Sequence, residues 1–397
     1  MDFKLEEKPE WGPLATFVPN KDEPVYNWFY YKEGFAKELV FRLAEMFSLK
    51  KGMTVLDPFC GVGTTLLACR QLGLDSLGFD VHPVAVFAAK VKVRDYDTEI
   101  LRSEIKNLIK AKFRLPKVPQ SGFARRFFHP RSLEDALFFR NLILENRDRA
   151  VRDFLLLGLM SVAIKCSYAY KDGAVVKVRK KPVAPMRDML RRQLFRMLRD
   201  LDSWKESVSR RFPANFKPEN AGEAHASFGD ARSLPIESES VDAVITSPPY
   251  LNKIEYTKIY EIERSLFLDF LEEKPAVRTY IGLSLSKLEK DMARLEGILD
   301  YETVKALPAE AIPYLVDMFQ AVEEMHRVCR KGAKLGIVIG NGCFPTGVVD
   351  SDILLSRMAE SVGFHVDKIL VLNKRWCTRN RVEKVGIARE SILLWNK

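Results

Sequence analysis

The chain has 397 residues, of which 47% are hydrophobic and 29% charged. This balance predicts a globular protein with a sizeable core, built as one large domain with insertions or as two domains, and excludes long disordered tracts. Lysine and arginine outnumber aspartate and glutamate by 63 to 53, and the resulting net charge of +10 suits a polyanionic partner.

Helices and short apolar runs alternate near the start of the chain. Residues 34–48 carry apolar side chains at helical spacing and lead into an apolar run at 53–57 that ends in an acid. A glycine-containing turn then opens a second helix, which we expect Gly73 to close, and a second apolar run ends at Asp80. A strand, a helix and a strand in this order predict parallel pairing.

Similar apolar runs recur in the second half of the chain, with helical stretches between several of them. They occupy residues 224–230, 241–250, 333–341 and 366–372. The whole pattern predicts an α/β protein with a doubly wound, Rossmann-like sheet.

Residues 95–223 interrupt this alternation and are expected to be mostly helical. They include a basic helix at 186–204, preceded by a loop that is rich in basic residues and contains prolines. The arginines of the helix recur at spacings near four residues, and the loop adds further positive charge: Arg187, Arg191, Arg192, Arg196 and Arg199, with Lys177, Arg179, Lys180 and Lys181. Such a face is either a solvated surface or a phosphate-binding one.

The expected organisation therefore has three parts. Residues 1–94 form the N-terminal segment and the first half of a cofactor-binding core, 95–223 form a helical basic insertion for substrate recognition, and 224–397 form the second half of the core.

The first chemical motif is the segment Asp57-Pro-Phe-Cys-Gly-Val-Gly-Thr-Thr at a turn from strand to helix. Glycines permit a tight turn and close approach of a ligand, and the helix that follows offers amides to a carboxylate. Asp80 at the end of the next strand can accept both hydroxyls of a ribose. A nucleotide-hydrolase loop is excluded because no G-K-[ST] follows, and a dinucleotide loop is disfavoured because Leu66 replaces the third glycine. A ligand with a ribose and a carboxylate, such as S-adenosylmethionine, fits better.

The second motif is Ser247-Pro248-Pro249-Tyr250, directly after an apolar strand. Two prolines stop the strand ladder and hold an extended turn, because neither offers an N–H. Pro248 O and Ser247 Oγ can then accept the hydrogens of an exocyclic amino group, which makes its nitrogen a better nucleophile toward a sulfonium methyl group. Tyr250 can stack on a base that has left its helix.

Together the two motifs resemble those of the amino-methyltransferase family, in particular its N4-cytosine type. The resemblance covers residues 25–93 and 224–397, and it implies a class I methyltransferase sheet whose last hairpin pairs residues 366–372 with 389–395. It also implies S-adenosylmethionine as cofactor, with Asp230 as the adenine-binding acid and the segment 30–35 beside the cofactor. The expected cofactor-binding residues are Asp57, Phe59, Gly61, Gly63, Thr64, Asp80 and Asp230, and the expected catalytic residues are Ser247, Pro248, Pro249 and Tyr250.

Other catalytic chemistries fit the sequence less well. A C5-cytosine methyltransferase needs a nucleophilic cysteine after the fourth strand, where this chain has Tyr250. Cys60 in the cofactor turn is interpreted as a packing residue, and His82 as a residue at the start of a helix. The histidines and cysteines lack metal-ligand spacing, so no metal is expected.

The sequence therefore predicts an enzyme that methylates N4 of cytosine in nucleic acid, with structured RNA such as ribosomal RNA slightly preferred because the insertion is helical and basic. The alternatives are a site-specific DNA methyltransferase acting on N4 of cytosine or N6 of adenine, and a nucleic-acid-binding module without activity. No signal peptide or bilayer-length apolar run is apparent, which predicts a cytoplasmic protein. Scarce glutamine and abundant charge suggest a source from a hot environment.

Overall fold

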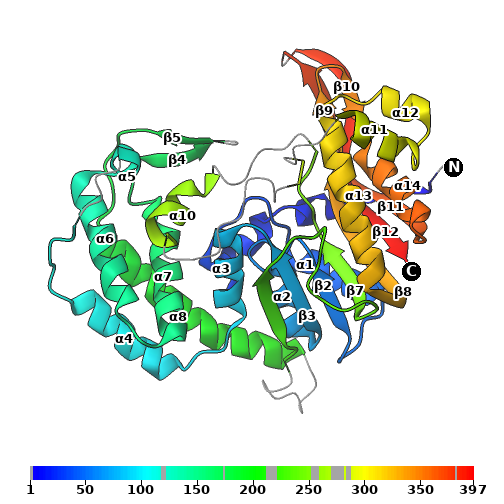
Figure 1. Ribbon diagram of the computed structural model, residues 1–397. Coiled ribbons are helices and arrows are strands. Elements are labelled where there is room, and N and C mark those ends of the chain that lie inside the picture. Colours follow the sequence, from blue (N-terminus) through cyan, green and yellow to red (C-terminus); the bar gives the residue numbers. More distant parts are fainter. Residues whose placement is uncertain are drawn as a thin grey trace.

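The computed structural model describes residues 3–117, 122–172, 175–211, 221–251, 259–269, 281–282, 288–380 and 382–397. It shows an α/β protein whose large sheet carries helices on both faces, with a helical lobe at one side (Figure 1). The strands of the large sheet are β1 Leu5–Glu7, β2 Thr54–Asp57, β3 Asp75–Asp80, β6 Ala224–Phe228, β7 Val241–Thr246, β8 Cys329–Gly340, β11 His365–Arg379 and β12 Glu383–Asn396. Two small hairpins consist of β4 Ala169–Asp172 with β5 Val175–Val178, and β9 Gly342–Phe344 with β10 Gly347–Val349.

The α-helices are α1 Lys37–Met46, α2 Thr64–Leu72, α3 Pro83–Val93, α4 Thr98–Lys110, α5 Gly122–Phe127, α6 Pro130–Leu144, α7 Arg149–Ala163, α8 Met186–Arg211, α10 Glu261–Phe267, α11 Leu288–Glu296, α12 Tyr301–Lys305, α13 Ala311–Val328 and α14 Ser351–Ser361. Three short 3₁₀ helices precede them, η1 Pro9–Ala15, η2 Val18–Asp22 and η3 Tyr26–Trp28. No helix among these described residues is long and apolar enough to cross a bilayer.

The strand order is β1-β11-β12-β8-β7-β2-β3-β6. Strands β6, β3, β2, β7 and β8 pair in parallel, whereas β12 is antiparallel to both β8 and β11. The doubly wound sheet and its terminal antiparallel hairpin therefore confirm the predicted fold. From β2 the chain proceeds outward through β3 to β6 and then returns to β7 on the other side of β2. The boundary between β2 and β7 is thus the point where strand order reverses, and open α/β sheets bind ligands at such a point.

Glycines set the ends of α2 as the sequence predicts. Gly63, the N-cap residue, and Gly73, the C-cap residue, both adopt the left-handed conformation, with φ of 83° and 68°. A side chain at either position would be strained, and at Gly63 a Cβ would also lie 3.1 Å from the Cβ of Ala89.

Each face of the sheet is buried under its own helices. On one face Leu39 and Leu43 of α1 pack with Val338 of β8 and Ile392 of β12. On the other face the buried side of α13 and α14 packs against alternate residues of the same strands, including Leu393. The central strands are therefore covered on both sides, which explains their continuous apolar sequences.

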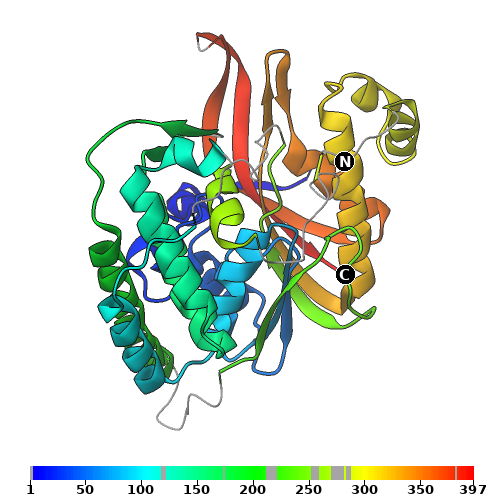
Figure 2. The same ribbon diagram turned by 60° about the vertical axis from the view of Figure 1, so that its left-hand side comes forward.

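The helical lobe, built from α4 to α8, lies between α3 and β6 in the chain and at one side of the sheet in space (Figures 1 and 2). Its core combines α7 and α8, and Trp28 from the N-terminal segment packs edge-on against Phe154 with ring centroids 5.3 Å apart. The lobe is not wholly helical, because it contains the hairpin of β4 and β5. Lys177 was expected in a loop but lies in β5, whose β-branched sequence Val-Val-Lys-Val favours a strand.

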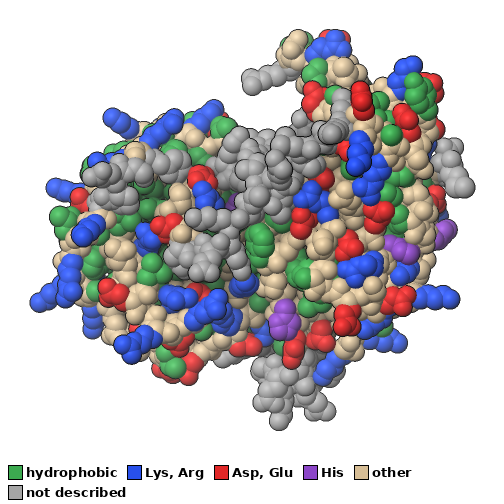
Figure 3. All heavy atoms as spheres, viewed as in Figure 1, with side chains coloured by type: hydrophobic (Ala, Val, Ile, Leu, Met, Phe, Trp, Pro, Cys, Tyr) green, Lys and Arg blue, Asp and Glu red, His purple; other side chains and the backbone are tan. Residues whose placement is uncertain are grey.

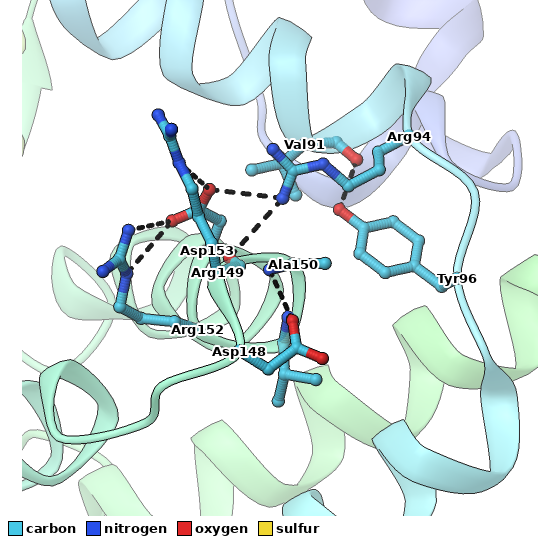
Figure 4. Close-up of polar contacts among 9 residues, drawn as sticks. Val91, Arg94, Tyr96, Asp148, Arg149, Ala150, Arg152 and Asp153 are labelled. Atoms are coloured by element: carbon cyan, nitrogen blue, oxygen red, sulfur yellow. Dashed lines mark hydrogen bonds and ion pairs between the residues drawn. The ribbon is translucent and has the colours of Figure 1, made fainter.

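Buried charge connects the lobe to the core (Figure 4). Asp153 of α7 is nearly buried and forms ion pairs with Arg94, which follows α3, and with Arg149 and Arg152 of its own helix. The Arg94 contact measures 3.3 Å, and beside it the Tyr96 hydroxyl donates to Val91 O at 2.7 Å. This cluster fixes the segment where the chain leaves the core and enters the lobe.

Candidate active site

A cavity of about 560 Å³ opens at the carboxyl ends of β2, β3 and β7, at the point where strand order reverses. Most of the residues singled out by the sequence line it together. These are Asp57, Phe59, Gly61, Thr64, Asp80, Asp230, Ser247, Pro248, Pro249 and Tyr250. Gly63 is not in the lining and instead caps α2 next to the cavity. A cavity of this size, between about 300 and 1,000 Å³, suits a small-molecule ligand.

Asp57 holds the two motifs together. Its Oδ1 accepts a hydrogen bond from the Thr246 hydroxyl at 2.6 Å and its Oδ2 accepts one from the Thr65 hydroxyl at 2.7 Å. The end of β7, the end of β2 and the first turn of α2 therefore share one buried carboxylate. Burial raises the pKa of Asp57 to about 6, and the hydroxyl donors oppose this rise.

The glycine turn and Asp80 form the next part of the wall. Asp80 Oδ2 accepts from the Gly61 amide at 2.9 Å, and its Oδ1 accepts from the His82 amide at 2.8 Å. These bonds fix the carboxylate at the end of β3, and burial raises its pKa to about 6. Gly61 has a φ of 49°, and a Cβ there would lie 3.2 Å from the Tyr31 ring, so the turn follows the cavity wall closely.

The Ser247-Pro248-Pro249-Tyr250 turn is held from three sides. The Tyr314 hydroxyl of α13 donates to Pro249 O at 2.8 Å. The Tyr250 hydroxyl donates to Glu390 Oε1 at 3.0 Å, and a Cβ on Gly340 would come within 2.6 Å of the Tyr250 ring. The ring thus packs closely against β8 and is hydrogen-bonded to β12. Among the described residues, none donates a hydrogen bond to Pro248 O or Ser247 Oγ, which leaves both acceptors available to a ligand.

Asp230 lies after β6, as the resemblance implies, but its carboxylate already has a strong partner. Arg232 binds both oxygens of Asp230, with the closest contact at 2.7 Å, and also reaches the buried Asp317 at 2.9 Å. The sequence Phe-Gly-Asp-Ala-Arg offered this signal, because an arginine two residues after an acid in a turn can fold back onto it. Any ligand contact to Asp230 therefore involves a carboxylate that Arg232 has positioned.

Aromatic and charged residues from three distant segments pack next to the glycine turn, where Tyr31 and Glu33 line the cavity. Tyr31 stacks on Tyr260 of the segment before α10, with ring centroids 5.1 Å apart. The Tyr260 hydroxyl donates to Glu33 Oε2 at 2.8 Å, and burial raises the pKa of Glu33. Lys171 of β4 lies over the Tyr260 ring, 3.6 Å from its centroid, and pairs with the buried Glu263 at 2.7 Å. The helical lobe therefore supports this wall from behind, through Lys171.

Two interpretations of individual residues are confirmed. Cys60 is buried and packs close to Gly78, and burial raises the pKa of its thiol, so it stays protonated. His82 is the N-cap residue of α3, where its Nδ1 accepts from the Ala85 amide at 3.4 Å. Burial lowers the pKa of His82 to about 3, so the imidazole stays neutral. Within the described ranges, no three His, Cys, Asp or Glu side chains are grouped so as to hold a metal ion.

The sequence did not predict several residues that contact the candidate site. Glu390, Tyr260 and Tyr314 reach the site from β12, from the segment before α10 and from α13. None carries a local motif, because each becomes a neighbour of the site only when the sheet and its covering helices assemble.

The predicted basic face of α8 is discontinuous. Arg187 donates to Ile109 O and Ala111 O and lies over the Phe139 ring, whereas Arg196 binds the Gln193 side chain at 2.7 Å. Only Arg191, Arg192 and Arg199 are exposed. Because the apolar side of α8 is buried, Arg187 and Arg196 lie close enough to other protein groups to bind them.

Comparison with known proteins agrees with these features. The family model described as DNA methylase matches residues 13–91, which include the glycine turn and Asp80. The type II methyltransferase M.BsoBI of Geobacillus stearothermophilus is 27% identical and aligns over 97% of this chain and 88% of its own length. M.AvaI of a Nostoc species is 26% identical, over 90% of this chain and 83% of its own.

Two further similarities are weaker. The type II methyltransferase M.MjaII of Methanocaldococcus jannaschii is 23% identical over 75% of this chain and 72% of its own length. A solved S-adenosylmethionine-dependent methyltransferase from Methanosarcina mazei covers 89% of this chain and 96% of its own with 9% identity, but its TM-score of 0.33 is too low to support an argument. None of these matches supports the expectation of a hot source. The glycine turn, the S-P-P-Y turn and the sequence matches together identify the chain as an S-adenosylmethionine-dependent methyltransferase that is similar to the N6/N4 DNA methylase family.

Proposed function

We infer that this enzyme transfers a methyl group from S-adenosylmethionine to N4 of cytosine in duplex DNA, as the methyltransferase of a type II restriction and modification system. The observation that carries this inference is the cavity at the reversal of strand order, which the glycine turn, Asp80 and the S-P-P-Y turn line together. The N4-cytosine assignment rests on Ser247 as the first residue of the S-P-P-Y turn.

DNA replaces RNA as the preferred substrate. The preference for structured RNA relied on a helical, basic insertion, and the comparisons do not support it. The curated relatives are type II methyltransferases, and the matching family model is described as DNA methylase. The helical lobe, residues 95–223, is proposed to recognise that substrate.

The residues present fit S-adenosylmethionine. Asp80 presents a fixed carboxylate that can accept both ribose hydroxyls, and the N-terminus of α2 after Gly63 can bind the carboxylate of the methionine moiety. Phe59 offers an apolar surface to the adenine, beside Asp230. When bound, the cofactor supplies an electrophilic methyl group.

The S-P-P-Y turn is proposed to present the base. Pro248 O and Ser247 Oγ accept the two hydrogens of the amino group, which draws the lone pair of N4 out of conjugation with the ring. Tyr250 stacks on the base after it has left the duplex. Because Gly340 and Glu390 already fix the Tyr250 ring, little conformational freedom is lost when the base arrives.

Product analysis tests this assignment. Purified enzyme and S-adenosylmethionine are incubated separately with phage λ DNA and with total ribosomal RNA, and the digested nucleosides are analysed by mass spectrometry. We expect N4-methylcytosine in the DNA alone, and none with the Tyr250→Ala variant. N6-methyladenine would keep the family assignment and change the target base, whereas 5-methylcytosine or methylated RNA alone would contradict the proposal.

A further inference from the structure

The ends of β11 and β12 form a two-stranded arm that projects beyond the sheet (Figure 2). β12 pairs with β8 only over residues 390–396, and β1 pairs with β11 only over 369–371. From Lys374 to Arg379 in β11, and from Glu383 to Arg389 in β12, the strands are paired with one another alone within the large sheet.

One face of this arm is covered. Cys377 and its cross-strand partner Gly386 face the small hairpin of β9 and β10. Cys377 Sγ lies 4.0 Å from Gly347 O, and a Cβ on Gly386 would come within 2.8 Å of Val348. Side chains alternate between the two faces of a strand, so the next pair along the arm points away from this hairpin.

That next pair is large, apolar and exposed. Trp376 and Ile387 are direct cross-strand partners and are 53% and 45% exposed. In Figure 2 the hairpin of β9 and β10 stands on one side of the arm and the helical lobe on the other. The exposed pair therefore lies on the face of the arm that this hairpin leaves uncovered.

The arm carries an excess of positively charged residues. Residues 373–387 contain five lysines and arginines and one glutamate. Lys384 Nζ lies over the Trp376 ring, 4.5 Å from its centroid, which orients the ring and places a cation at its face. Figure 3 shows lysine and arginine side chains at the top of the molecule, where the arm ends, and along the upper edge of the helical lobe.

The arm also lies next to the cavity. Glu390 lines the cavity and holds Tyr250, and Ile387 is three residues away on the same strand. At about 3.3 Å per residue, Ile387 lies about 10 Å along β12 from Glu390 at the edge of the cavity.

We propose that the arm is a docking surface for the duplex DNA beside the target base, with Trp376 and Ile387 packed into a groove and the neighbouring lysines and arginines against phosphates. The inference rests on the proposed function. Charge selects DNA over a second copy of this chain, because two such arms would bring like charges together. Apolar side chains inserted in a groove and flanked by cations are a common mode of DNA contact.

The test measures methyl transfer to phage λ DNA with tritiated S-adenosylmethionine over a range of DNA concentrations. Trp376→Ala is expected to raise the KM for DNA about 5- to 100-fold, the range that loss of aromatic stacking gives, with little change in cofactor affinity. Trp376→Phe should recover most of the loss. Tyr301→Ala is the matched control, because Tyr301 is 56% exposed and lies under Lys305 but belongs to α12.

Two substitutions of opposite charge at residue 387 distinguish loss of DNA docking from misfolding. Ile387→Glu should weaken DNA binding and Ile387→Lys should preserve it, although both place a charge at the same exposed position. Any one of three results would overturn the proposal. The first is an unchanged KM for DNA in Trp376→Ala, and the second is an equal effect of Glu and Lys at residue 387. The third is a fall in oligomer mass, measured by light scattering, with the KM unaltered. If the wild-type enzyme itself transfers no methyl group to λ DNA, the proposed function fails, whereas an active wild type with unaffected variants refutes the docking surface alone.

Discussion

Tyr31 and Tyr260 stack with their ring planes 18° apart and so join the N-terminal segment to the start of α10 beside the cavity, which Tyr31 lines. Lys171, from the hairpin of β4 and β5, adds a cation over the same ring. Three segments that are distant in sequence therefore define one wall. We expect a substitution in any of these segments to alter ligand binding in the cavity.

Tyr260→Phe should destabilise the protein mainly at neutral pH. The substitution keeps the stack and removes the donor to Glu33, so the pKa of this buried acid, already raised by burial, rises further. An acid whose pKa is higher in the folded state loses stability as pH rises, so the loss should reach about 1–3 kcal/mol at pH 7.5 and shrink toward pH 4.5.

Urea unfolding at the two pH values measures this effect. Tyr96→Phe is the control, because the Tyr96 hydroxyl donates to the carbonyl of Val91 and its loss should cost the same free energy at both. Equal losses for Tyr260→Phe at both pH values would contradict the role given to Glu33.

Asp80→Ala should weaken cofactor binding by about 1.5–3 kcal/mol, the contribution expected of a charged acceptor. The reason is the loss of a carboxylate that the Gly61 and His82 amides hold at the end of β3. Isothermal titration calorimetry with S-adenosylmethionine measures the change. Unaltered affinity would mean that the ribose is bound elsewhere.

Tyr250→Ala and Pro248→Ala should abolish or strongly reduce methyl transfer while cofactor affinity survives, because these residues present the base. Tyr250→Phe should keep much of the activity, since the ring face stacks on the base and the hydroxyl only anchors the ring to Glu390. Single-turnover methyl transfer to λ DNA measures each variant. A fully active Tyr250→Ala enzyme would refute this mechanism.

Lys92→Met should remove a pH dependence of stability. Lys92 is buried in α3, donates to Tyr26 O at 2.9 Å, and burial lowers its pKa to about 7 from 10.5. Between these values the unfolded chain binds more protons, so the free energy of unfolding of the wild type should rise with pH, by at most about 1.4 kcal/mol per pH unit.

Chemical unfolding at pH 7.5 and 9 tests this, with Lys90→Met in the same helix as a control that should retain the slope. A Lys92→Met protein whose stability rises as steeply as that of the wild type would show that the slope has another source.

The two basic groups of the helical lobe should contribute differently to DNA binding. Replacing Arg191, Arg192 and Arg199 by Gln tests α8, and replacing Arg179, Lys180 and Lys181 tests the segment after β5. Figure 1 shows β4 and β5 at the opposite end of the lobe from α8, and Lys171 of β4 lies over Tyr260, which stacks on the cavity residue Tyr31. We therefore expect the second set to flatten the salt dependence of binding to λ DNA more than the first, with cofactor affinity intact in both.

Binding isotherms at several salt concentrations compare the two sets, and the exposed pair Lys50 and Lys51 after α1 serves as control. A larger change of slope from the α8 set would place the duplex along that helix.

The sequence was sufficient for the sheet and for both motifs, because these depend on local rules. Acid-terminated apolar runs predicted β2 and β3, and glycines predicted the ends of α2. The S-P-P-Y turn was expected at the edge of the sheet that also carries the glycine turn, and the structure has both there.

Contacts made across the sheet or between segments were not predictable. Nothing near Glu390 in sequence indicates that it accepts from Tyr250, because β12 and the end of β7 meet only in the assembled sheet, with β8 between them. Likewise, helical periodicity placed Arg187 and Arg196 on one basic face but could not show that Ile109 O binds Arg187 and that the Gln193 side chain in the same helix binds Arg196. Tertiary packing decides which side chains of a helix remain exposed.

The place where the helical lobe joins the core has an evolutionary consequence. The chain leaves after α3 and returns at β6, which pairs with β3, the strand before α3. The two junctions are therefore close in space, and closing a longer or shorter loop between them costs little entropy. The lobe can then diverge, or be exchanged between relatives, while β2, β7 and the reactive turns keep their geometry. New target specificities can arise in this way without rebuilding the catalyst.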